Sequence, residues 1–106
     1  MITVELIHDR DCPNAEGTRR ELRLALESAG LPARWTEWVR QDPGAPSHAL
    51  RYGSPTVLVN GRDVASVAPS DGLATCRLYT WNGERVGFPP ADLIAGALRG
   101  ALGEAS

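Results

Sequence analysis

The chain has 106 residues, of which 42% are hydrophobic and 23% are charged, and its formal net charge is −2. This length and composition are typical of one globular domain, so we expect a single domain over residues 1–106. The charges are interspersed and no apolar run approaches the roughly 20 residues of a membrane span, so we expect neither a nucleic-acid nor a membrane partner.

The first third of the chain predicts a strand–helix–strand unit. Residues 2–8 alternate apolar and polar side chains, as a strand does, and Pro13 fits the first position of a helix because its missing N–H would have no partner there. Apolar residues at helical spacing predict that this helix covers residues 14–29, and residues 33–39 favour a second strand. This order implies a parallel pair joined by a crossover helix.

The next segment predicts a short helix and a hairpin. Residues 46–52 begin at a proline and are followed by a glycine, which favours a short helix. Residues 56–59 are apolar or β-branched and precede Asn60-Gly61, a strong hairpin turn signal, so we expect the strand to return over residues 63–66. The hairpin implies an antiparallel pair in the same sheet.

The last third predicts a loop, a strand and a helix. Residues 67–75 are typical of a loop, and residues 77–81 predict a further strand before an Asn-Gly turn. Pro90 opens a helix whose apolar residues follow helical spacing and which Gly103 closes. The fold class that we expect is α/β, with a central mixed four-stranded sheet flanked by helices in the order β-α-β-α-β-β-α.

The two cysteines, Cys12 and Cys76, are too few for a disulfide-stapled secreted scaffold. The first residues carry no basic segment followed by an apolar one, as a signal peptide does. We therefore expect a cytoplasmic protein whose cysteines are thiols. The alternative for each cysteine is a small buried side chain without chemistry.

Cys12 lies where the first predicted strand ends and the first predicted helix begins. The free N–H groups and partial positive charge of a helix N-terminus stabilise a thiolate, which is why reactive cysteines favour this position. The neighbouring Asp9 and Asp11 oppose ionisation of the thiol. His8 is expected to have a structural role, with pairing to the thiolate or metal ligation as the alternative.

Pro55 marks the first residue of a predicted strand, because a proline there removes one ladder hydrogen bond. It is a candidate for a cis peptide bond, with an ordinary trans turn proline as the alternative. Together with the order of elements, a Cys-Pro at a helix start and a Ser-Pro-Thr before a hairpin resemble the thioredoxin and glutaredoxin superfamily. The run C-P-N-A, residues 12–15, is similar to the glutaredoxin pattern C-P-x-C, with Ala15 in place of the second cysteine.

This resemblance implies a thioredoxin-like fold in which Pro55 is cis and faces a nucleophilic Cys12. It also implies two loops around the nucleophile. The substrate-facing loop contains Ser54, Pro55 and Thr56, and the helix-start loop contains Asp11, Pro13 and Asn14. The alanine in place of the second cysteine argues against ordinary dithiol reductase activity.

A closer similarity covers nearly the whole chain. Small bacterial thioredoxin-like proteins, often labelled as related to alkylmercury lyase, carry D-x-C-P-N, G-S-P-T-V-L-V-x-G-x-D and C-R-x-Y in this order. Here the last two segments are G-S-P-T-V-L-V-N-G-R-D over residues 53–63 and C-R-L-Y over residues 76–79. The first segment is D-C-P-N over residues 11–14, which departs from the pattern because no residue separates the aspartate from the cysteine. This similarity implies a connection with mercury resistance.

Three functions remain open at this point. The first is redox exchange with a thiol or disulfide substrate, in which Cys12 is the nucleophile, Cys76 is the resolving thiol and no cofactor is required. The second is the binding or processing of an organomercurial or of a soft metal (mercury, copper(I) or zinc) through Cys12 and Cys76. The third is an interaction module whose thiols are inert.

Overall fold

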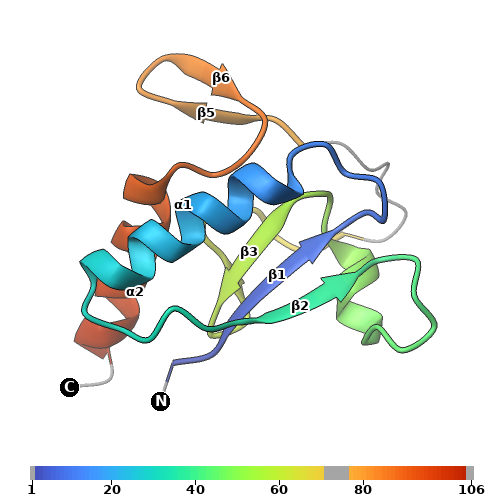
Figure 1. Cartoon of the computed structure of the whole chain (residues 1–106), viewed down its shortest axis with the longest axis horizontal. Coiled ribbons are helices and arrows are strands. Elements are labelled where there is room, and N and C mark those ends of the chain that lie inside the picture. Colours follow the sequence, from blue (N-terminus) through green and yellow to red (C-terminus); the bar gives the residue numbers. More distant parts are fainter. Residues whose placement is uncertain (1, 71–76, 105–106) are drawn as a thin grey trace.

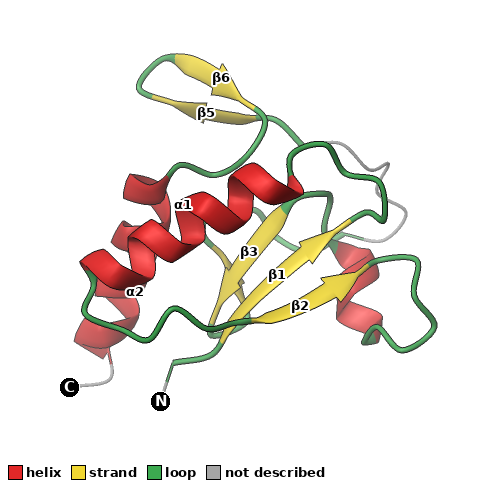
Figure 2. Cartoon of the chain, viewed as in Figure 1, coloured by secondary structure: helices red, strands yellow, loops and turns green. Residues whose placement is uncertain are grey.

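A computed structural model describes residues 2–70 and 77–104 of this mixed α/β protein (Figures 1 and 2). The elements are β1 (Val4–His8), α1 (Ala15–Ser28), β2 (Thr36–Val39), the 3₁₀ helix η1 (Ser47–Arg51), β3 (Thr56–Val59), β4 (Arg62–Asp63), β5 (Tyr79–Trp81), β6 (Glu84–Val86) and α2 (Ala91–Glu104). Neither of the two α-helices in these ranges is long and apolar enough to cross a membrane.

Four strands form one mixed sheet in the order β2-β1-β3-β4. β1 and β2 are parallel, with His8 opposite Val39, whereas β1 pairs with β3 and β3 with β4 in antiparallel fashion. This arrangement confirms the predicted crossover unit, the predicted hairpin and the predicted four-stranded mixed sheet. The hairpin turn at Asn60 and Gly61 has φ values of 51° and 79°, the positive values that a two-residue turn of this kind needs.

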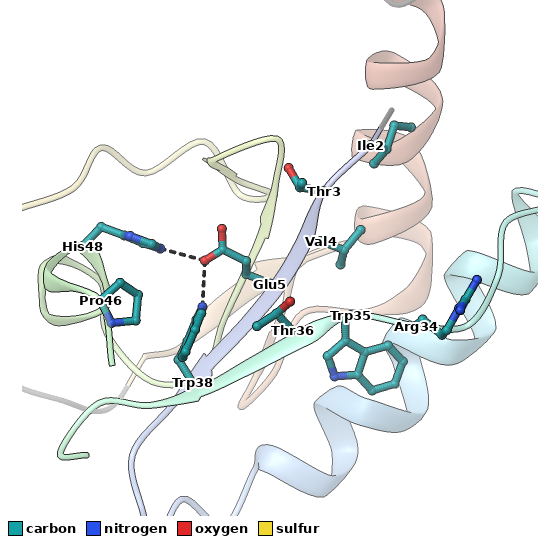
Figure 3. Close-up of a pocket in the computed structure, with 10 residues that line it drawn as sticks. All are labelled: Ile2, Thr3, Val4, Glu5, Arg34, Trp35, Thr36, Trp38, Pro46 and His48. Carbon is teal, nitrogen blue, oxygen red and sulfur yellow. Dashed lines mark hydrogen bonds and ion pairs between the residues drawn. The ribbon is translucent and has the colours of Figure 1, made fainter. Parts of the chain in front are cut away.

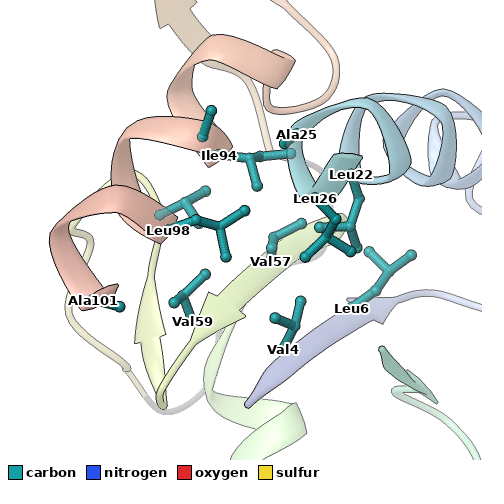
Figure 4. Packing of buried hydrophobic residues seen from close by; sticks show 12 residues of the cluster. Val4, Leu6, Leu22, Ala25, Leu26, Val57, Val59, Ile94, Leu98 and Ala101 are labelled. Atoms are coloured by element: carbon teal, nitrogen blue, oxygen red, sulfur yellow. The ribbon is translucent and has the colours of Figure 1, made fainter. Parts of the chain in front are cut away.

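The main core lies between one face of the sheet and the two α-helices, which pack against each other (Figure 4). Alternate residues of β1 and β3 point to this face, because successive side chains of a strand lie on opposite sides. The fully buried large side chains of this core are Leu6, Leu22, Leu26, Val57, Ile94 and Leu98. On the opposite face, Ile7 and Leu58 form a smaller cluster with Ala49 and Tyr52.

The start of α1 differs from the prediction. The helix begins at Ala15 with Asn14 as its N-cap, so Pro13 is not the first helical residue. Pro13 is instead the second residue of a tight turn in which the Ala15 N–H donates to the Cys12 carbonyl at 3.3 Å. The fixed φ of proline favours this turn position. The prediction failed because proline suits both places.

Other boundaries also differ from the prediction. β2 begins at Thr36 and not at residue 33, and β5 begins at Tyr79 and not at residue 77. β4 ends at Asp63 and does not continue to Ser66, because the chain turns there: the Ser66 N–H donates to the Asp63 carbonyl at 2.8 Å, and Ser66 has a φ of 61°. α2 does not stop before Gly103 but continues to Glu104.

β5 and β6 form a separate two-stranded sheet, of which only the first strand was predicted. The chain that leaves this hairpin crosses α1 on its way to α2 (Figure 1). Two glycines permit the close contact: a Cβ atom on Gly17 would lie 2.6 Å from the ring of Phe88, and one on Gly87 would lie 2.6 Å from Nδ2 of Asn14. The hairpin is thereby connected to the first turn of α1, next to Cys12.

Candidate functional site

Cys12 lies in the loop between β1 and α1, two residues before the N-cap of the helix. Its backbone is fixed on both sides, because its N–H donates to the carbonyl of Asp9 at 3.1 Å and its own carbonyl accepts from Ala15. The side chain is half-buried, and it is a free thiol in the part of the chain that the structure describes. The loop therefore holds the sulfur at the start of α1, as the sequence predicts.

Cys12 and Ser54 line the same pocket, which has a volume of about 430 Å³. The rest of the lining comes from the β1–α1 loop and from one residue after β2, namely Asp9, Arg10, Asp11, Pro13, Asn14 and Gln41. The Ser54 hydroxyl accepts the N–H of Asp9 at 2.8 Å and so connects the two loops. The Ser54–Pro55 peptide bond is cis, as the resemblance implies.

Arg77 makes three hydrogen bonds to Ser54, Thr56 and Asp63, on both sides of Pro55 and in β4. Its backbone N–H donates to the Ser54 carbonyl at 2.8 Å, and its guanidinium donates to Thr56 Oγ1 and to Asp63 Oδ2, each at 2.9 Å. Asp63 and Thr56 are both buried, so these bonds form away from water, where they are stronger. Sequence analysis placed Arg77 in a strand and gave it no role at the site.

Tyr79 contacts the same loop, because its hydroxyl donates a hydrogen bond to the carbonyl of Pro55. Burial raises the pKa of Tyr79 above its usual value, so the phenol remains a neutral donor. The Arg77 guanidinium lies 4.4 Å from the centre of the Tyr79 ring, within the range of a cation–π contact. Tyr79 of β5 and Arg77 thus both hold the loop before β3, Tyr79 through Pro55 and Arg77 through Ser54 and Thr56.

The charge of Asp9 is compensated by residues that follow β2. Arg40 donates to Asp9 Oδ1 at 2.6 Å and Gln41 donates to the same oxygen at 2.7 Å. The Arg40 and Asp9 side chains are only 6% and 18% exposed. Asp11 is exposed, and its carboxylate has no ion-pair or hydrogen-bond partner among residues 2–70 and 77–104.

Both ring nitrogens of His8 lie within hydrogen-bond distance of an oxygen atom, one of a carboxylate and one of a backbone carbonyl. Its Nε2 lies 3.0 Å from Glu37 Oε2, and its Nδ1 lies 2.8 Å from the carbonyl oxygen of Asp9. Arg19 donates to Glu37 at 2.6 Å, and this bond lowers the pKa of Glu37 to about 2. Both ring nitrogens of His8 are engaged, so the structural role expected for it fits better than metal ligation.

The structure brings five of the predicted site residues together at one pocket: Asp11, Cys12, Pro13, Asn14 and Ser54. Pro55 and Thr56 are fully buried, and they shape the loop that carries Ser54. Cys76 lies outside the described residues. In the described part of the chain, no three His, Cys, Asp or Glu side chains gather where they could hold a metal ion.

A second pocket, of about 510 Å³, lies beside the first half of β1 and the start of β2 (Figure 3). The carboxylate of Glu5 accepts there from Trp38 Nε1 at 3.0 Å, and His48 Nε2 lies 2.7 Å from the same oxygen. None of the predicted site residues lines this pocket, and it contains no nucleophilic thiol. The chemistry indicated by the sequence therefore belongs to the Cys12 pocket.

Comparison of the chain with protein-family models, with curated proteins and with solved structures finds no match. The resemblance described from the sequence motifs therefore stays a prediction.

Proposed function

We propose that this chain is a thioredoxin-like thiol protein in which Cys12 is the nucleophile of thiol–disulfide exchange. The observation that carries the proposal is the pocket shared by Cys12, at the start of α1, and Ser54, in the loop before β3. A half-buried but accessible sulfur at a helix start has the position from which a thiolate attacks a disulfide. The parallel crossover followed by an antiparallel hairpin supports the same fold assignment.

The first step is attack of the Cys12 thiolate on one sulfur of a substrate disulfide. A bond forms between Cys12 Sγ and that sulfur, the substrate S–S bond breaks, and the other sulfur leaves with the electron pair and takes up a proton. A second thiolate then attacks Cys12 Sγ and releases the bound sulfur as a thiol. The substrate gains two electrons, and the two attacking thiols become a disulfide.

Cys76 is the proposed resolving thiol, because Ala15 stands where the glutaredoxin pattern has its second cysteine. Two facts support this assignment: Cys76 is the other cysteine of the chain, and its neighbour Arg77 is bonded to Ser54 at the Cys12 pocket. The product of this route is a Cys12–Cys76 disulfide, which an external thiol then reduces.

Single substitutions of the two cysteines test the proposal. Exchange with a small aromatic disulfide is followed by absorbance, and intact mass detects a trapped adduct. We expect Cys12→Ser to abolish exchange and Cys76→Ser to accumulate a mixed disulfide on Cys12. Thermal unfolding of both variants shows whether the fold is preserved. Full exchange activity in Cys12→Ser would overturn the proposal.

The same variants distinguish the two other functions. A soft-metal carrier would take up one mercury or copper(I) ion per chain in competition with a chromophoric chelator, and both cysteines would be needed. An inert-thiol interaction module would show slow alkylation of both cysteines in the folded state. Rapid alkylation of Cys12 with no tight metal uptake favours redox exchange over both.

A further inference from the structure

The two ring nitrogens of His8 both face oxygen atoms that only accept hydrogen bonds. The ring is 5% exposed, its Nδ1 faces the backbone carbonyl of Asp9 and its Nε2 faces the carboxylate of Glu37. Glu37 is ionised near neutral pH, because Arg19 lowers its pKa to about 2. A neutral imidazole has only one N–H, so both contacts can be hydrogen bonds donated by the ring only in the imidazolium form.

The charged groups around His8 are consistent with a cation at this position. From β2, Glu37 faces the ring, and from α1, Arg19 binds the same carboxylate at 2.6 Å. After β2, the backbone N–H of Arg40 donates to the His8 carbonyl at 2.9 Å, and Nη1 of its guanidinium donates to the side chain of Asp9. The buried Nε of the same guanidinium has no hydrogen-bond partner among the described residues. Glu37 is therefore the anion that faces the buried ring, and Arg19 binds the same carboxylate oxygen.

The carbonyl of Asp9 links this ring to Cys12. The same oxygen that faces His8 Nδ1 at 2.8 Å accepts the backbone N–H of Cys12 at 3.1 Å. Without its Nδ1 proton, the ring would direct a lone pair at this oxygen, and the repulsion would turn the Asp9 peptide away. Cys12 would then lose the acceptor that fixes its backbone.

We propose that protonated His8 is a positioning residue for Cys12, and that loss of its proton loosens the Asp9–Cys12 turn and lowers the reactivity of the thiol. The inference rests on the proposed function only for the role of Cys12 as a nucleophile. His8 acts through the backbone of Asp9, and pH thereby regulates the site.

Nuclear magnetic resonance of the full chain, with ¹⁵N in the histidine rings and the backbone, tests the contact directly. Between pH 5 and 9 we expect the backbone amide of Cys12 to shift with the same midpoint as the His8 ring. His48, which lies in the other pocket, provides the comparison ring. A Cys12 amide that does not follow His8, or a His8 Nδ1 without a proton at pH 5, would overturn the inference.

Substitutions then test the effect on the thiol. Asparagine at position 8 keeps a donor near the place of Nδ1, whereas glutamine keeps one near the place of Nε2, and neither titrates. At pH 6 we expect His8→Gln to lower the alkylation rate of Cys12 by about tenfold, the effect of losing one charged hydrogen bond. His8→Asn should retain most of the rate, and the matched control His48→Gln should leave it unchanged.

Equal alkylation rates in the wild-type chain and His8→Gln would contradict the inference. Neither the resonance measurement nor the alkylation needs a disulfide substrate. If Cys12 fails to exchange disulfides while its amide still follows His8, the proposed function fails and this inference stands. If Cys12 exchanges disulfides but its amide does not follow the titration of His8, the proposed function stands and this inference fails.

Discussion

Replacing Arg40 with methionine removes the main partner of the Asp9 carboxylate while keeping most of the side-chain volume. The two side chains are 6% and 18% exposed and are joined at 2.6 Å, so the variant leaves a largely buried charge with Gln41 as its remaining donor. Removing one partner of a buried ion pair costs about 3–5 kcal/mol. Because Asp9 keeps some contact with water, we expect the lower end, about 3 kcal/mol.

Urea unfolding of Arg40→Met, Asp9→Asn and the double variant measures the interaction as a double-mutant cycle. We expect a coupling free energy of about 2 kcal/mol, since the double variant no longer buries an unpaired charge. Arg10→Met is the matched control, because its ion pair with Asp42 has side chains that are 60% and 50% exposed. That control should cost at most about 1 kcal/mol. A coupling below about 0.5 kcal/mol, or equal effects of Arg40→Met and Arg10→Met, would refute the reasoning.

Three further predictions concern the helices and the charges near the site. In Gly17→Ala, overlap of the new methyl group with the Phe88 ring should outweigh the gain in helix propensity and destabilise the chain by about 1 kcal/mol. Gly96→Ala has open space around its Cβ and should stabilise the chain by about as much. Thermal unfolding compares the two variants. The fold lowers the pKa of Glu37 from its usual 4.5 to about 2, so the ionised side chain stabilises the fold above about pH 4.5 and this effect is lost as pH falls towards 2. The urea midpoint of Glu37→Gln should therefore change less with pH in this range than that of the wild-type chain. Ala15→Cys should form an intramolecular disulfide with Cys12, detected by intact mass after alkylation, because the two residues close one tight turn.

Much of the fold could be predicted from the sequence, because its local signals agree with one another. The alternation in residues 2–8, the helical spacing after Pro13 and the turn at Asn60-Gly61 each predicted an element that the structure contains. β6 was missed because the segment Glu84–Val86 is three residues long and mostly polar. A segment this short has no periodicity to detect, and it pairs only because the turn before it directs it back.

The side-chain contacts around the Cys12 pocket cannot be predicted from local sequence patterns. Arg40 is a single arginine after a strand, and it becomes a partner of Asp9 only because β1 and β2 are parallel with His8 opposite Val39. Given that register, residue 40 follows one strand end and residue 9 follows the other at the same edge of the sheet. The sequence predicts the parallel pair of strands but not its register, and without the register the contact between Arg40 and Asp9 could not be predicted.

In the proposed exchange, the alanine at position 15 offers no sulfur to resolve a mixed disulfide on Cys12. Ala15 is buried at the first residue of α1, where the glutaredoxin pattern would have a second sulfur. The accessible approach to Cys12 is the pocket that it shares with Ser54. In the proposed mechanism a resolving thiolate would reach Cys12 from this pocket, either from an external thiol or from Cys76, whose neighbour Arg77 is hydrogen-bonded to Ser54. Ala15→Cys would supply a second route, so the double variant Ala15→Cys, Cys76→Ser should release the mixed disulfide that Cys76→Ser alone retains.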